Sequence, residues 1–130
     1  MIAIDTNIVL RLILGDDLKQ IAAIRRIMVH ETVFISLTVL LEVGWVLASR
    51  YRLPRVDVAT ALSSILALEG VEASRPAIAR WAIERYRCGA DWADMAHLVS
   101  ASKIGGFATL DQRLAKSAGM DAPVVIETLA

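Results

Sequence analysis

The stretch TVFISLTVLLEVGWVLAS, residues 32–49, decides the fold class because it joins a strand pattern directly to a helix pattern. TVFI is β-branched and aromatic, which favours a strand. Ser36 or Thr38 then offers an N-cap, and the apolar run to Ser49 is long enough for a helix. Glu42 lies near the middle of that helix. Burying an unpaired carboxylate costs several kcal/mol, so Glu42 needs a partner or a solvent-facing position. Arg50, eight residues on, is too far for a local ion pair.

The same alternation of strand and helix patterns runs along the whole chain. Strands are expected over 1–5, 32–35, 71–73, 107–110 and 124–127, and helices over 6–14, 17–29, 36–49, 55–68, 76–87, 90–105 and 111–119. The first strand is mostly apolar and is expected to be buried. Thr6 or Asn7 is the expected N-cap of the first helix, and Asp16 that of the second. No linker or repeat interrupts the pattern. We therefore predict a single α/β domain over residues 1–130, with a short, mainly parallel sheet flanked by helices on both faces.

The amino-acid composition indicates the cellular compartment of the protein and the kinds of partner it could bind. Of the 130 residues 56% are hydrophobic, yet no apolar run reaches the about 20 residues that span a bilayer. We expect no membrane association. The single cysteine, Cys88, suits a reducing cytoplasm. The apolar surplus favours a homodimer or a tightly held protein partner. Acidic and basic residues balance at 14 each, so a nucleic acid would be held by a local patch or a metal ion.

Acidic residues occupy positions where the predicted fold would bring them together. Asp5 and Asp111 directly follow strands, Asp91 and Asp94 share a helix face, and Glu42 has no local partner. If these segments meet at one sheet edge, four or five carboxylates converge there. Two carboxylates about 4 Å apart repel by about 4 kcal/mol at an effective dielectric constant near 20, so the cluster needs protons or a hard cation. Oxygen ligands favour one or two Mg²⁺ or Mn²⁺ ions and metal-assisted phosphodiester hydrolysis.

The order of these segments is similar to that in a known family. MIAIDTNIVLRLIL, the lone Glu42 in LTVLLEVGWVL, DWADMAHL and ATLDQRL resemble the PIN-domain ribonucleases, and most closely the VapC-type toxins of toxin–antitoxin pairs. The resemblance covers nearly the entire chain. It implies a PIN-like three-layer fold and a metal-dependent endoribonuclease that leaves 5′-phosphate and 3′-hydroxyl ends. It also implies a cognate antitoxin that holds the toxin inactive, and a dimer.

The resemblance also assigns roles to individual residues. It implies that Asp5, Glu42, Asp94 and Asp111 form the catalytic, metal-binding pocket and that Asn7 supports it by hydrogen bonding. Asp91 matches a position that is often acidic in the family. There it either supports the metal ligands or is itself a shared metal ligand. Met95 stands where alanine is common, without a foreseeable effect on the site.

Simpler roles exist for each of these residues. Asp5, Asp91, Asp94 and Asp111 could each cap or solvate the start of a helix. His97 is better explained by helix packing than by proton transfer, and Thr109 by a turn than by ligand binding. Trp45, Trp81 and Trp92 could stack on bases of single-stranded RNA, but a place in the core or at an interface explains Trp45 better. Arg11, Arg113 and Lys116 are candidates for RNA-phosphate contacts, although a solvated face explains them equally well.

Two other functions stay open at this stage. One is a phosphatase with Asp5 as its nucleophile, which the absence of an aspartate at Asn7 disfavours. The other is a PIN-fold module that binds protein without catalysis. The sequence names neither the RNA nor the antitoxin.

Overall fold

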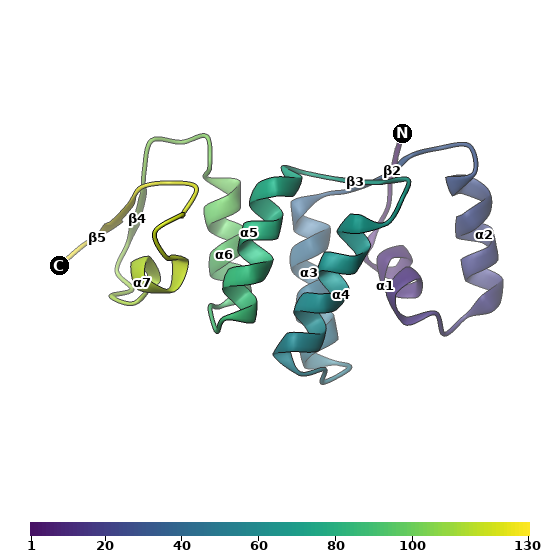
Figure 1. Cartoon of the computed structure of the whole chain (residues 1–130), viewed down its shortest axis with the longest axis horizontal. Helices are drawn as coiled ribbons and strands as arrows, with labels where there is room; N and C mark the ends of the chain where they lie inside the picture. The colour runs from purple at the N-terminus through teal and green to yellow at the C-terminus, as the bar shows by residue number, and fades with distance from the viewer.

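Five short strands and seven helices alternate along the chain in a computed structural model that describes all of residues 1–130 (Figure 1). The strands are β1 Ile2–Ala3, β2 Val33–Ile35, β3 Val71–Ala73, β4 Phe107–Thr109 and β5 Ile126–Thr128. The helices are α1 Thr6–Leu14, α2 Leu18–Met28, α3 Leu37–Ser49, α4 Arg55–Ala67, α5 Pro76–Arg87, α6 Trp92–Ser100 and α7 Leu114–Ala118. The predicted α/β class is confirmed.

The strands form two parallel sheets where one was expected. One sheet has the order β1-β2-β3, and the other pairs β4 with β5. In Figure 1 the β4–β5 pair and α7 lie at the C-terminal end of the molecule, and α5 and α6 stand between them and the first sheet. β1 and β4 therefore do not share a sheet edge.

The core lies where α3 packs against α1, α4 and α6. Its fully buried side chains include Leu40, Val43 and Leu47, which lie on one side of α3. Trp92, at the start of α6, is also buried, and its indole N–H donates to the carbonyl oxygens of Leu40 and Leu41 at 3.3 and 3.2 Å. This contact fixes the first turn of α6 against α3.

Two details of the elements differ from the expectations. The first strand was predicted to be buried, but Ile2 is 43% exposed and only Ile4, just beyond the strand, is buried. Asp5 and Asp17 cap α1 and α2 in place of Thr6 or Asn7 and Asp16. None of the helices combines the length and apolar character needed to cross a membrane.

Candidate functional site

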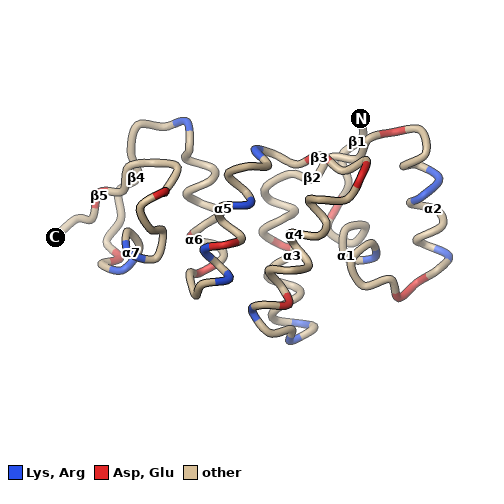
Figure 2. The backbone as a smooth tube through the Cα atoms, in the orientation of Figure 1, with Lys and Arg blue, Asp and Glu red and all other residues tan.

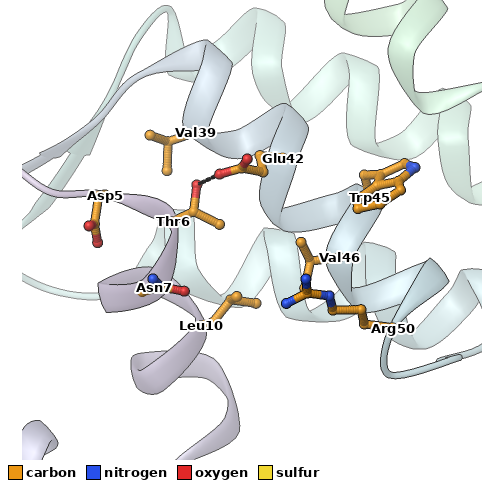
Figure 3. Close-up of a pocket in the computed structure, with 9 residues that line it drawn as sticks. All are labelled: Asp5, Thr6, Asn7, Leu10, Val39, Glu42, Trp45, Val46 and Arg50. Carbon is orange, nitrogen blue, oxygen red and sulfur yellow. Dashed lines mark hydrogen bonds between the residues drawn. The ribbon is translucent and has the colours of Figure 1, made fainter.

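Asp5 and Glu42 border one cavity of about 430 Å³ between α1 and α3 (Figure 3). Asp5 caps α1 by accepting the backbone N–H of Ile8 at 3.0 Å, so the capping role considered for it is real. The bond engages one carboxylate oxygen, and the second oxygen stays free for a ligand. Glu42 is exposed and accepts a hydrogen bond from the hydroxyl of Thr6. Glu42 is therefore not a buried charge: it lies at the cavity, and a residue next to Asp5 orients it.

The other residues that line the cavity are apolar side chains and, farther along α3, an aromatic ring and a cation. Leu10, Val39 and Val46 supply apolar surface, and Trp45 and Arg50 complete the wall. Trp45 is 62% exposed, so it does not lie in the core, and the alternative position at an interface stays a prediction. Sequence reasoning missed Arg50 as a site residue and considered Trp45 only as a less favoured base-stacking residue. The available signal was helical spacing, because positions 42, 46 and 50 recur every four residues and position 45 lies three residues after 42.

Asp91, Asp94 and Asp111 form a second acidic group, at the start of α6 and beyond β4. Asp91 caps α6 by accepting the backbone N–H of Asp94 at 3.0 Å. The pKa of Asp94 is raised, first by burial and then by the charges of Asp91 and Asp111, while His97 opposes the shift. Asp94 therefore lies within electrostatic reach of all three groups.

Local hydrogen bonds hold Asp111 and the residues around it. Asp111 accepts the backbone N–H of Arg113 at 2.9 Å, and its own N–H donates to the hydroxyl of Thr109 at 3.0 Å. Thr109 thus orients the turn that carries Asp111, which is the turn role considered for it, and its supporting role at the site stays a prediction. Arg113 and Lys116 are exposed beside this turn and make no ion pair.

The structure does not join the two acidic groups, and Figure 2 shows the acidic residues spread along the chain. No three Asp, Glu, His or Cys side chains lie close enough together to hold a metal ion. The cause is the division of the strands: Asp5 follows β1 and Asp111 follows β4, and these strands lie in different sheets. The catalytic and metal-binding roles of Asp5, Glu42, Asp91, Asp94 and Asp111 stay predictions.

The chemistry of the donors suits a hard cation. All the candidate ligands are carboxylate oxygens, which Mg²⁺ and Mn²⁺ prefer. Mg²⁺ is commonly held by only one or two carboxylates together with waters and substrate phosphates. Asp5 and Glu42 on one open cavity meet that requirement, with Asn7 beside them on the cavity wall.

Arg11 differs from the other candidates for RNA contacts because its guanidinium is already engaged. It pairs with Asp16 at 2.8 Å and donates to Gln20 at 3.0 Å. The hydrogen bond and the charge of Asp16 raise the pKa of Arg11. A phosphate would have to compete with these partners.

Residues 2–120 match the family model described as PIN domain, which includes all four predicted catalytic acids. A search of the curated proteins gives no match.

Proposed function

Because the chain belongs to the PIN domain family, whose members are typically nucleases, we propose that it is a Mg²⁺- or Mn²⁺-dependent endoribonuclease. We further propose that it is the toxin of a type II toxin–antitoxin pair and that a cognate antitoxin inhibits it. The order of Asp5, Glu42, Asp94 and Asp111 along the chain supports the toxin assignment.

The observation that carries the proposal is the pair of carboxylates on the cavity between α1 and α3. Asp5 and Glu42 lie far apart in the sequence, yet both border the same cavity. The hydroxyl of Thr6, next to Asp5, donates a hydrogen bond to Glu42. A purely structural role does not require two exposed acids at one hollow, because like charges there repel. A ligand that brings positive charge accounts for both.

The proposed reaction is hydrolysis of an RNA phosphodiester bond. Asp5 and Glu42 would hold one or two Mg²⁺ or Mn²⁺ ions, with Asp94, Asp111 and Asp91 as further ligands or supports. When bound, such an ion supplies an activated water and offsets the charge that develops on the phosphate. Thr6 keeps the Glu42 carboxylate turned toward the cavity. Asn7 supports the site by hydrogen bonding.

A non-catalytic PIN-fold module is the second candidate, and one observation favours it: no three acids are gathered into a metal-binding group. Titration with Mn²⁺ separates the two. A module of this kind binds its protein partner but no Mn²⁺, whereas the nuclease binds Mn²⁺ and loses it when Asp5 or Glu42 is changed. The phosphatase alternative stays disfavoured, because Asn7 lies at the cavity where that chemistry needs a second aspartate.

A homodimer is part of the proposal, and the free strand edges support it. β1 bonds β2 through the N–H groups of Ile2 and Ile4, which leaves the polar backbone of Ala3 facing outward. β4 likewise uses Phe107 and Thr109 to bond β5 and leaves Ala108 outward. Exposed apolar side chains lie next to both edges: Met1, Ile2 and Leu110. Unpaired edges of this kind favour pairing with another chain.

We propose that β4 of one copy pairs with β1 of the other. This arrangement would set Asp111 of one chain beside Asp5 of its partner and join the two acidic groups. We place the protein in the cytoplasm, where an exposed free Cys88 remains reduced.

The products identify the reaction class. Hydrolysis by an activated water leaves a 5′-phosphate and a 3′-hydroxyl, and it does not use the ribose 2′-hydroxyl as the nucleophile. An RNA with a single 2′-deoxy nucleotide at the cleavage position should therefore still be cut. Products that end in 2′,3′-cyclic phosphate, or complete resistance of the 2′-deoxy substrate, would rule out this reaction.

A further inference from the structure

Trp45 and Arg50 share the cavity of Asp5 and Glu42, and neither is explained by the folding of the chain. Trp45 exposes 62% of its surface, whereas Trp92 is buried and satisfies its indole N–H on α3. Exposing a large ring on the most apolar helix forgoes burial that would stabilise the fold. A ligand that covers the ring would explain its position.

Arg50 is a cation without a partner in the protein. It follows α3 directly, is exposed, and makes neither an ion pair nor a side-chain hydrogen bond. Some other arginines are engaged, such as Arg55, which donates to the carbonyl oxygens of Tyr86 and Ala90, and Arg11, which pairs with Asp16. Among the residues that line the cavity, Arg50 is the one basic side chain. Figure 3 shows the guanidinium of Arg50 turned back along α3 toward Val46 and the cavity. The cavity thus contains one free positive charge and two carboxylates.

The sequence spacing along α3 gives the relative positions of Glu42, Trp45 and Arg50 on the helix. Trp45 lies three residues after Glu42, so the two side chains are neighbours on the helix surface. Arg50 lies eight residues after Glu42, about 12 Å along the helix axis at about 1.5 Å per residue. The cavity therefore combines a carboxylate pair, an aromatic ring and a guanidinium that is turned back toward Val46 (Figure 3). A polyanion is repelled by the bare carboxylates and attracted by Arg50.

We propose that Trp45 and Arg50 form a subsite for an unpaired nucleotide adjacent to the bond that is cut. The base stacks on the ring of Trp45, and its phosphate binds the guanidinium of Arg50. Aromatic rings bind bases that are free of a duplex, and arginine forms paired hydrogen bonds with phosphate. The subsite rests on the proposed function for its neighbouring scissile bond, but it binds RNA without needing the reaction.

The test is RNA binding in EDTA, where no cleavage occurs. A short fluorescein-labelled single-stranded RNA is titrated with wild type, Trp45→Ala, Trp45→Phe and Arg50→Gln, and binding is followed by fluorescence anisotropy. Leu18→Ala and Arg26→Gln are matched controls, because both residues are exposed, lie on α2 and do not line the cavity. Circular dichroism checks that each variant is folded.

The expected losses follow from the two contacts. Trp45→Ala should weaken binding by about 5- to 150-fold, and Trp45→Phe by much less. Arg50→Gln should lower the slope of log affinity against log salt by about 0.7, the value for one phosphate contact on a single strand. The same RNA annealed to its complement should bind wild type and Trp45→Ala alike.

Three results would overturn the subsite. The first is unchanged RNA affinity in both Trp45→Ala and Arg50→Gln. The second is equal losses in the α2 controls. The third is that Trp45→Ala and Arg50→Gln bind RNA normally but no longer bind a protein partner. That result would assign the surface to protein binding. If the variants show the expected losses of RNA affinity but the wild-type protein never cleaves RNA, the subsite is supported and the proposed nuclease is contradicted. The two proposals therefore fail separately.

Discussion

Thr6 is the residue that determines how Glu42 faces the cavity. Its hydroxyl donates to the Glu42 carboxylate from the first turn of α1, so it couples the strand–helix junction at Asp5 to α3. A group that orients a metal-binding carboxylate typically contributes 10- to 100-fold to metal affinity or activity. We expect Thr6→Val to lower Mn²⁺ affinity by about that factor and Thr6→Ser to retain it. Isothermal titration with Mn²⁺ measures both. Equal affinities for Thr6→Val and wild type would show that Glu42 needs no orientation.

Asp94 gives a second prediction at this scale, in the metal-free protein. Its raised pKa means that the folded chain holds this proton more tightly than the unfolded chain does. The resulting stabilisation is complete below the unfolded pKa of about 3.9 and is lost as pH rises through the folded pKa. The N-terminus of α6 favours the ionised form, but burial and the charges of Asp91 and Asp111 outweigh it.

Asp94→Asn removes this unfavourable ionisation. The variant should have a higher free energy of unfolding than wild type at neutral pH in EDTA, and the difference should shrink as the pH falls through the pKa of Asp94. Urea unfolding at a series of pH values measures the difference. Glu127→Gln, at an exposed acid on β5, is the control. A variant that is less stable than wild type at neutral pH would contradict the assigned cause of the shift.

At the level of elements, α3 and α6 meet at Gly44. A Cβ atom there would lie 2.7 Å from Cδ1 of Trp92, closer than carbon atoms approach without displacement. Gly→Ala inside a helix normally stabilises by about 0.5–1 kcal/mol, but overpacking a core costs about 1–3 kcal/mol. We expect Gly44→Ala to destabilise the protein by about 1–2 kcal/mol, because Trp92 must move and weaken its bonds to α3.

Chemical unfolding tests this directly, with Gly105→Ala as the matched control. A Cβ at Gly105 meets nothing within 4 Å, so that variant should be close to wild type. If both variants show the same free energy of unfolding, the close approach of α3 and α6 at Gly44 is not present in solution.

The elements show how far sequence patterns predict this fold. α3 follows the prediction to within a residue, because Ser36 supplies a local cap and the apolar run ends at Arg50. The helix expected over 90–105 is shorter, since α6 ends at Ser100. The burial of β1 was predicted wrongly because it depends on a neighbouring strand, and the partner of a strand is set by distant residues. Likewise, the position of Asp5 at a strand end was predictable, but its cavity with Trp45 and Arg50 depends on how α1 packs against α3.

At the scale of the whole molecule, the division into two sheets separates the acids. Local patterns identify strands, but they do not say which strands pair. Asp5 and Glu42 therefore lie at one cavity, whereas Asp94 and Asp111 lie with the second group. The proposed homodimer, with β4 of one copy on β1 of the other, would complete each site from two chains.

Mixed dimers test this arrangement. Asp5→Asn and Asp111→Asn should each be inactive alone, but their co-expressed mixture should regain RNA cleavage, because one of the two composite sites in each mixed dimer keeps all its acids. Asp5→Asn mixed with Glu42→Gln should not recover, since both acids belong to the same half of the site. Differently tagged copies confirm that mixed dimers form. Absence of recovery in confirmed Asp5→Asn/Asp111→Asn dimers would exclude a shared site.

The most direct test of the central claim is RNA cleavage by purified, partner-free protein, with Mn²⁺ and with EDTA. Wild type, Asp94→Asn and the control Glu127→Gln are run side by side. We predict that wild type and Glu127→Gln cleave RNA only with Mn²⁺. The cleavage rate of Asp94→Asn should be lower by about 10- to 100-fold or more. That is the loss typical when a group that orients a metal ligand is removed, and Asp94 is a proposed ligand itself. Cleavage by Asp94→Asn at the wild-type rate, or in EDTA, would contradict a metal-dependent nuclease at these acids.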